Sequence, residues 1–363
     1  MFNPTRLTIA RKRKGLTMTA LARAIEMSPR SVSEYEARLE PPSDVLARIV
    51  EATGFPASFF SGDELEMPHA EAVSFRALSK MSAIERDRAL SQGALALEFN
   101  KWIEHRFDLP ASDLLDLSQE TDPEAAAASL RQLWGLGEAP VRNMIHLLET
   151  KGVRVYSLAV DSLQVDAFSL WNNQTPFVFL NTQKSAERSR FDAAHELGHL
   201  LLHRHALKED TRLAEDEANQ FASAFLMPRA GTLSRAPRFV TIQSLIERKA
   251  FWTVSVAALN HRYHGLGVTN DWQYRHLSAE ISKLGYRTCE PNSASRESSQ
   301  LLSKVLASLR EDMWSQRDVA DALNLPPTEI EQLLFGLTMT SLDGGGGKRS
   351  SPASSSAALK LVQ

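Results

Sequence analysis

The sequence predicts a mostly helical α+β protein, with all-α segments towards both ends and a small β-sheet between them. Apolar residues recur at spacings of three and four over residues 1–62, which is typical of a bundle of short helices. Short runs rich in β-branched and aromatic residues, typical of strands, gather in the middle of the chain at 153–182. The helical spacing then resumes and continues to about residue 338.

Changes in composition divide the 363 residues into five expected segments. The less periodic stretch after the N-terminal bundle indicates a linker, and the Gly/Ser-rich end of the chain indicates a disordered tail. The expected segments are the bundle at 1–62, the linker at 63–80, a central domain at 81–230, a C-terminal helical region at 231–338 and the tail at 339–363.

Composition excludes several classes of protein. Hydrophobic residues make up 43% of the chain and charged residues 23%, an ordinary globular balance. The one cysteine, Cys289, rules out an internal disulfide and a cysteine-based metal site within the chain. No signal peptide and no membrane-spanning apolar run is recognisable, so we expect a soluble, cytoplasmic protein that does not bind membranes. The net charge of −3 does not exclude nucleic acid, because a basic patch can lie within a near-neutral total.

The N-terminal bundle contains two predicted helices joined by a short turn. The first covers residues 19–25, and the second covers 28–38, with Ser28 as N-cap and Pro29 at the first helical position. Such a pair can place its second helix in the major groove of DNA, where the first residues of that helix meet base edges. The side chains expected to face outward and to contact bases or phosphates are Arg30, Ser31 and Ser33.

Local charge also favours a nucleic-acid interface. The first 25 residues contain six basic residues and no acidic one, and among them we expect phosphate contacts from Arg11, Arg13 and Lys14. The stretches "TALARAIEMSPRSVSEYEAR" and "PPSDVLARIVEATGFPASFF" resemble the XRE (Cro/CI-type) helix-turn-helix family. The resemblance implies binding to double-stranded operator DNA, and a two-fold operator would suggest a homodimer. The alternative is a basic bundle that contacts another protein.

The first half of the central domain is predicted to contain two helices, and short strands follow them. One helix is predicted at 82–105, and another at 122–134 with Asp122 as N-cap and Pro123 at its first position. The runs "VRVYSL", "VDAFSLW" and "PFVFLNT", separated by "DSLQ" and "NNQT", predict a small β-meander.

The stretch "SRFDAAHELGHLLLH" follows the strands directly and contains His-Glu-x-x-His. On a helix, His195 and His199 project from one face about 6 Å apart along the axis, close enough to share one cation. Glu196 is rotated by one residue, where a carboxylate that is not a ligand can accept a proton from water and pass it to a leaving amine. The flanking residues are apolar or small, so we expect the helix to be largely buried. Polar side chains on a buried helix are unfavourable unless they bind a partner, such as a metal ion.

A zinc site of this kind requires a third protein ligand. Glu215 and Asn219 are four residues apart on a second predicted helix, so one of them can bind the metal while the other hydrogen-bonds a ligand histidine. We favour Glu215 as the ligand, with Glu217 as second choice. His203 would lie about 6 Å further along the first helix, and His205 lies just past its expected end, so both are weaker alternatives.

The combination "RFDAAHELGHLLLH … EDEANQFASAFLMP", over roughly residues 140–230, resembles the ImmA/IrrE family of zinc metallopeptidase-like proteins. The resemblance implies a zincin-like domain that binds Zn²⁺ through His195, His199 and Glu215, with Glu196 as the general base. It also implies cleavage of a helix-turn-helix repressor, although such a site can bind metal without proteolysis. Guesses for a residue that stabilises the oxyanion are Arg190, Tyr263 and His264.

The C-terminal stretch "SQRDVADALNLPPTEIEQLLFG" has the rhythm of a second helix-turn-helix, with Ser315 as a cap. It is acidic where a DNA-binding helix would be basic, which favours a role in packing or dimerisation.

Three functions fit these observations. The first is a prokaryotic transcriptional regulator that hydrolyses peptide bonds of itself or of a repressor partner to control transcription. The second is a DNA-binding regulator or antitoxin whose zinc fold senses or binds a partner, such as a toxin, without proteolysis. The third is a protease whose helix-turn-helix domain recognises a protein instead of an operator.

Overall fold

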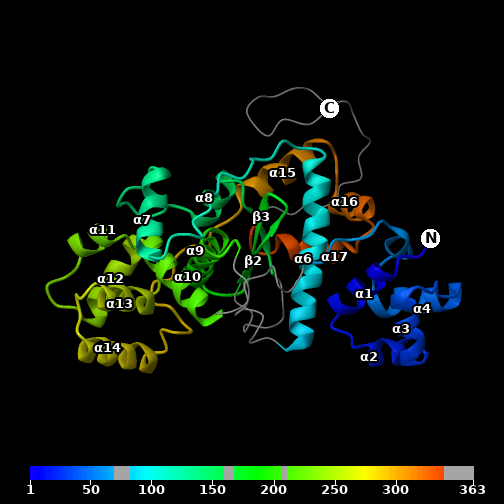
Figure 1. The fold of residues 1–363 in the computed structure, drawn as a ribbon, viewed down its shortest axis with the longest axis horizontal. Helices are drawn as coiled ribbons and strands as arrows, with labels where there is room; N and C mark the ends of the chain where they lie inside the picture. The colour runs from blue at the N-terminus through cyan, green and yellow to red at the C-terminus, as the bar shows by residue number, and fades with distance from the viewer. Residues whose placement is uncertain (69–81, 159–166, 206–210, 339–363) are drawn as a thin grey trace. The chain divides into compact units, whose positions relative to one another are not determined.

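The computed structural model describes four parts of the chain, residues 1–68, 82–158, 167–205 and 211–338. It is mostly helical with one small three-stranded sheet, which confirms the predicted fold class (Figure 1). Within these residues, no helix is both long and apolar enough to cross a membrane. The predicted tail at 339–363 and most of the predicted linker at 63–80 lie outside the described residues.

The chain divides into two compact units that are discontinuous in sequence. The first contains residues 1–110, 156–165 and 299–363, and the second contains 111–155 and 166–298. This division differs from the expected segments, because the helix at 82–105 groups with the N-terminal bundle, and 231–298 groups with the central domain. The whole of the second unit is therefore inserted, in two segments, into the sequence of the first.

Short helical segments form the N-terminal bundle: α1 (Pro4–Arg13), α2 (Met18–Ala24), α3 (Pro29–Ala37), α4 (Ser43–Thr53) and the 3-10 helix η1 (Ala57–Ser61). The hydroxyl of Ser28 accepts a hydrogen bond from the Ser31 amide at 3.0 Å and caps α3, as predicted. Glu26, in the turn between α2 and α3, has a left-handed φ of 54°. The shared core is fully buried and includes Leu7, Ile9, Leu21, Ile25, Val32, Ile49, Phe55 and Phe59.

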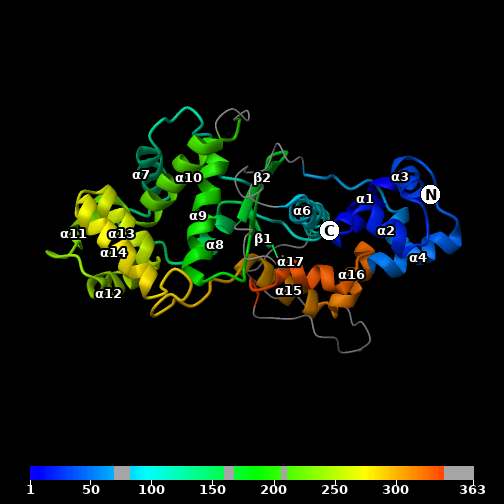
Figure 2. The ribbon, with the colours of Figure 1, turned by 90° about the horizontal axis from the view of Figure 1, so that it is seen from below.

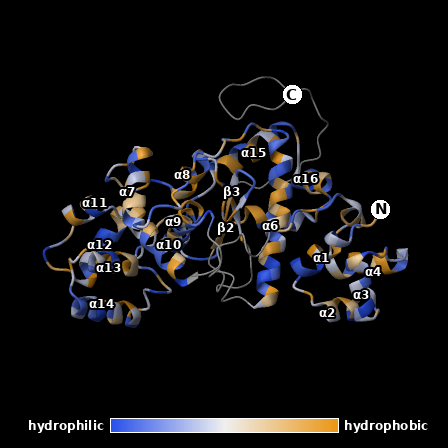
Figure 3. Ribbon diagram, viewed as in Figure 1, coloured by the Kyte–Doolittle hydropathy of each residue, from blue (hydrophilic) through white to orange (hydrophobic). Residues whose placement is uncertain are grey.

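The first unit also contains α6 (Ala83–Glu104), α15 (Gln300–Glu311), α16 (Gln316–Leu323) and α17 (Pro327–Leu334). α6 packs against α1, α16 and α17, and Figure 3 shows hydrophobic bands along α6 between hydrophilic ones. Trp102 of α6 meets Trp314 edge to face, with ring centroids 5.6 Å apart. Ser315 caps α16 as predicted, and α16 and α17 pack against each other as well as against α6.

The sheet consists of β1 (Arg154–Ser157), β2 (Ala167–Asn172) and β3 (Thr175–Leu180) in the order β1-β3-β2. The predicted meander is therefore wrong, because a meander would place β2 in the middle. β2 and β3 form an antiparallel hairpin, and Asn173 in its turn has a φ of 53°, which suits a two-residue hairpin loop. In the sequence, nine residues separate β1 from β2, more than the roughly two to five of a hairpin loop.

The helices of the second unit are α7 (Pro123–Leu133), α8 (Met144–Thr150), α9 (Ala186–Leu202), α10 (Thr211–Leu226), α11 (Arg229–Ser234), α12 (Ile242–Trp252), α13 (Val256–Gly265) and α14 (Asp271–Lys283). Asp122 caps α7, as predicted. α9 packs against β2, β3 and α10, and Figure 2 shows α9 and α10 side by side. Gly198 permits this close approach, because a Cβ there would lie 3.1 Å from the Phe221 ring and 3.3 Å from the Cα of Ala218.

Candidate metal centre

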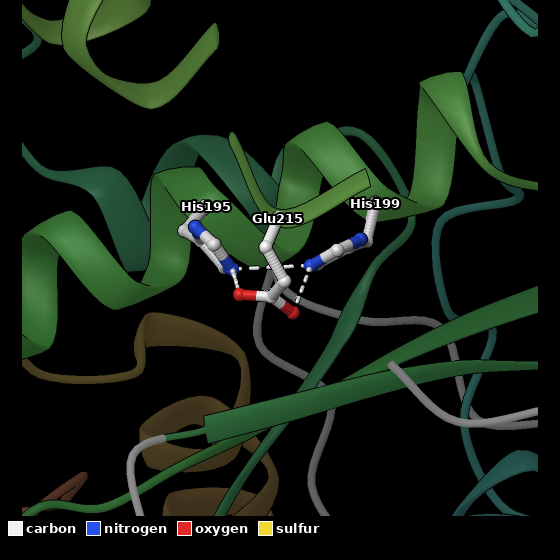
Figure 4. A group of neighbouring side chains, drawn as sticks. All are labelled: His195, His199 and Glu215. Carbon is white, nitrogen blue, oxygen red and sulfur yellow. Dashed lines mark hydrogen bonds and ion pairs between the residues drawn. The ribbon is translucent and has the colours of Figure 1, made fainter. Parts of the chain in front are cut away.

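Three side chains of the kind that bind metals converge between α9 and α10. His195 and His199 lie one turn apart on α9, and their Nε2 atoms are 3.1 Å apart. Glu215 of α10 places one carboxylate oxygen 3.5 Å from His195 Nε2 and the other 3.3 Å from His199 Nε2. Figure 4 shows this carboxylate beside both imidazoles. One ligand atom from each residue lies within 4.8 Å of the others, so the three could bind one ion.

The chemistry of this cluster fits a cation. His199 is 8% exposed and Glu215 is 6% exposed, and buried polar groups require compensating interactions. Two ring nitrogens at 3.1 Å repel each other if both present lone pairs, and a proton or a metal ion between them removes the repulsion. Two imidazoles and one glutamate are also the donor set of a class of catalytic zinc sites that leave one position open.

Burial and neighbouring charges set the protonation states of the cluster. Burial lowers the pKa of His199 to about 4 despite its hydrogen bond to Glu215, so this imidazole is neutral at neutral pH. Burial also opposes the charged form of His195, but the hydrogen bond to Glu215 and the charge of Glu196 outweigh it and raise the pKa of His195. Burial would raise the pKa of Glu215, but hydrogen bonds from both histidines hold that pKa well below its usual range.

Zinc binding should therefore release a proton from the cluster. Metal ligands must be deprotonated, and the raised pKa of His195 means that a proton competes with the metal for this ring. The apparent zinc affinity should rise as the pH rises through that pKa. Protons compete with the metal for His199 only at much lower pH, because the pKa of His199 is about 4. Calorimetry measures the released proton when the metal-free protein is titrated with zinc in buffers of different ionisation enthalpy. A suitable pH is 6.5, the ordinary pKa of histidine. A binding heat that is the same in all buffers would contradict this expectation.

Asn219 lies against the ring of His195. Its Oδ1 is 3.1 Å from His195 Nδ1, while the Nε2 of the same ring faces Glu215. A histidine that binds metal through one nitrogen commonly donates its other N–H to an oxygen, which fixes the orientation of the ring. The position of Asn219 suits the orienting role expected for it.

The alternative third ligands make other contacts. Oε2 of Glu217 lies 2.8 Å from His203 Nε2, and His203 Nδ1 lies 3.0 Å from the Nδ1 of His199, on the ring edge away from the cluster. His205 pairs with Asp116 at 2.8 Å. Within the described parts of the chain, the group of side chains that could hold a metal ion contains Glu215 and not Glu217.

Glu196 lies next to the cluster on α9, and its carboxylate accepts a hydrogen bond from a residue of β2. The Ser169 hydroxyl donates a hydrogen bond of 2.7 Å to Oε2 of Glu196. Trp171, two residues further along β2, donates from Nε1 to the Leu200 carbonyl at 3.2 Å. Since both bonds join β2 to α9, the hairpin positions the glutamate carboxylate as well as covering the helix.

Ser169 is a residue of the site that the sequence pattern did not predict. The available signal was a polar residue between two apolar ones, Phe168 and Leu170, and the structure buries all three. A buried hydroxyl needs a hydrogen-bond partner, but the sequence does not show that the partner is Glu196.

Of the three guesses for an oxyanion-stabilising residue, Arg190 and His264 pair with carboxylates outside the cluster. The guanidinium of Arg190 pairs with Glu297. Tyr263 is fully buried, and His264 lies 3.4 Å from Asp271.

α3 exposes the polar residues predicted to meet DNA. The side chain of Arg30 is 88% exposed and pairs with Glu34 at 3.3 Å along the helix. Ser33 is exposed, and the hydroxyl of the partly exposed Ser31 lies 2.9 Å from that of Ser28. The opposite face of α3 packs into the bundle, so the first turns of this helix present a polar edge to solvent.

The basic residues of α1 and of the turn after it are engaged within the first unit. Nε of Arg11 lies 2.5 Å from Glu36. Arg13 and Lys14 both pair with Glu329 of α17, at 2.6 and 3.1 Å. Because Arg11 and Arg13 are buried and all three cations have carboxylate partners, we leave them out of the DNA-contacting surface proposed below.

Comparison with protein families gives two matches. The helix-turn-helix family matches residues 7–60, and the IrrE N-terminal-like domain matches residues 148–264. No curated protein matches the chain. The first match covers α1 to α4 and supports DNA binding. The second contains α9 and α10 with the whole cluster, and extends beyond the expected end of the central domain at 230. The chain therefore joins a segment that matches the helix-turn-helix family to a segment that matches the metallopeptidase-like IrrE N-terminal-like domain.

Proposed function

We propose that the protein is a DNA-binding transcriptional regulator whose IrrE-like domain is a zinc-dependent endopeptidase. Its substrate would be a peptide bond of the regulator itself or of a helix-turn-helix repressor partner, and cleavage would change transcription. The observation that carries this proposal is the position of Glu196 next to the cluster of His195, His199 and Glu215.

The cluster would supply the metal ligands. His195 and His199 would bind through Nε2, and Glu215 through its carboxylate, since these are the atoms that converge. A zinc ion held there would act as a Lewis acid that polarises a peptide carbonyl and lowers the pKa of water towards neutrality.

Glu196 would move the proton. Its carboxylate accepts a proton from water as the water oxygen bonds to the carbonyl carbon, and returns that proton to the amine nitrogen as the C–N bond breaks. The hydroxyl of Ser169 holds Oε2 of this carboxylate and so limits its rotation. The reaction consumes one water molecule and forms one carboxylic acid and one amine.

The burial of Glu196 favours a second candidate function. This residue is 2% exposed, and a peptide must reach it before hydrolysis can occur. A regulator or antitoxin whose metal-holding domain senses zinc or binds a partner protein needs no such access. The two functions differ in whether regulation depends on the Glu196 carboxylate.

Operator binding should depend on Arg30. Because its guanidinium is exposed near the start of α3, Arg30→Ala should weaken binding to the DNA upstream of the gene by about 1–3 kcal/mol, the usual value of a good base contact. Fluorescence anisotropy at several salt concentrations measures this loss. Arg229→Ala removes the same charge from an exposed position in the second unit and should have no effect. Unchanged DNA affinity in Arg30→Ala would remove the operator role of this face and favour recognition of a protein.

A further inference from the structure

The ring of His199 has a polar partner at both of its nitrogens. Its Nε2 faces the cluster, 3.1 Å from His195 Nε2 and 3.3 Å from a carboxylate oxygen of Glu215. Its Nδ1 lies 3.0 Å from Nδ1 of His203, and Nε2 of His203 lies 2.8 Å from Oε2 of Glu217. These contacts form a continuous relay from the cluster to a carboxylate that is 28% exposed.

One set of hydrogen positions satisfies the relay when a metal is bound. A histidine that binds a cation through Nε2 carries its hydrogen on Nδ1, so His199 donates to Nδ1 of His203. His203 then carries its own hydrogen on Nε2 and donates it to Glu217. If His199 carried its hydrogen on Nε2 instead, it would direct an N–H at the cluster and would have no lone pair for the metal.

We propose that His203 and Glu217 are positioning residues that fix His199 in the tautomer and orientation that bind zinc. This inference rests on the proposed metal site and adds two residues to it. Neither residue touches the converging ligand atoms, and both act through His199.

The packing of α9 against α10 builds this relay. His203 comes one turn after His199 and ends α9, and its backbone amide donates to the His199 carbonyl at 3.0 Å. Residues four apart lie on one helix face, and the two ring centroids are 5.1 Å apart. Glu217 comes from α10, the helix that also delivers Glu215, and α10 comes close to α9 at Gly198. The same helix pair thus provides a ligand and the end of the relay.

The two histidines of the cluster are oriented by different chemistry. The amide oxygen of Asn219 faces His195 and is neutral. His199 instead faces an imidazole whose far nitrogen meets a carboxylate. Hydrogen bonds in such a chain polarise one another, and a terminal carboxylate makes the metal-bound imidazole a stronger ligand. Loss of the Glu217 charge should therefore weaken zinc binding even where the hydrogen-bonded geometry is kept.

The relay can be tested by measuring the zinc dissociation constants of variants of the whole chain. The measurement uses competition with a chromophoric chelator at one pH. His203→Ala should weaken zinc binding by about 10- to 100-fold, the range typical for loss of an outer hydrogen-bond partner. Glu217→Gln should weaken binding by a smaller factor. His203→Gln should stay near the wild type, because its amide oxygen can accept from His199 and its NH₂ group can donate to Glu217.

Two matched variants and a double variant control for unspecific effects. Asp216→Asn removes a carboxylate from the exposed side of α10, and His205→Ala removes an exposed imidazole after α9; both should bind zinc like the wild type. The double variant His203→Ala/Glu217→Gln should bind no more weakly than His203→Ala, since Glu217 acts through His203. Visible absorption of the cobalt-loaded protein should change in His203→Ala and stay unchanged in both controls.

The outcomes separate the relay from the site on which it rests. Equal zinc affinity in the wild type and in a folded His203→Ala variant, with cooperative thermal unfolding, would overturn the relay and leave the metal site standing. Full additivity in the double variant would also overturn it, because the two residues would then act independently. Failure of the wild type to bind zinc would overturn the metal site itself, and the relay with it.

Discussion

Glu196→Gln should keep its zinc and lose peptide-bond hydrolysis. The amide has nearly the shape of the carboxylate and can still accept the hydrogen bond from Ser169, but it cannot take a proton from water. We expect the cleavage rate to fall by about 10²- to 10⁴-fold, the usual contribution of a general base. The protein is incubated alone and with any helix-turn-helix repressor encoded next to its gene. Mass spectrometry then measures cleavage, and metal analysis measures retained zinc.

Glu280→Gln provides a control that removes the same charge from α14, outside the cluster. It should cleave at the wild-type rate. A Glu196→Gln variant that also cleaves at that rate would show that Glu196 is not the general base. If Glu196→Gln regulates its promoter like the wild type, regulation does not require proteolysis, and the second candidate function is favoured.

Glu215→Ala should lose most of its zinc affinity. This residue provides the only carboxylate of the cluster identified in the described residues, and its removal leaves two histidines on one helix. We expect a loss greater than the roughly 10- to 100-fold that follows removal of an outer hydrogen-bond partner. Chelator competition measures the affinity. In the metal-free variant, NMR titration should show a lower pKa for His195, because burial then acts without the opposing hydrogen bond and charge of Glu215.

Asp216→Ala is the matched control for this variant, since it removes the neighbouring carboxylate on the exposed side of α10. It should bind zinc normally. Wild-type zinc affinity in Glu215→Ala would mean that the third ligand is another residue and that the convergence of Glu215 on the histidines does not reflect metal binding.

Local spacing explains which parts of the fold could be predicted. Ser28, Asp122 and Ser315 cap helices as expected, because a cap depends on the few residues that follow it. His195 and His199 share a helix face for the same reason, since a separation of four residues is enough to align them. The convergence of Glu215 with them required the further assumption that its helix packs against theirs.

Long-range contacts explain what could not be predicted. The positive charges of Arg13 and Lys14 suggested a surface for phosphates, but their partner Glu329 lies more than 300 residues away in sequence. The strand order β1-β3-β2 likewise did not follow from the turn-like stretches "DSLQ" and "NNQT", because it depends on a pairing between strands that are not consecutive in sequence. The role of Ser169 depends on how β2 crosses α9, and alternation along a single strand does not reveal it.

Zinc content of the purified protein is the most direct test of the proposed metal site. Mass spectrometric metal analysis after chelator-free purification should find about one zinc ion per chain in the wild type, as expected for one site with three protein ligands. The double variant His195→Ala/His199→Ala should contain none. Equal zinc content in the wild type and the double variant, or no zinc in a wild-type sample supplied with the metal, would contradict zinc binding by this cluster.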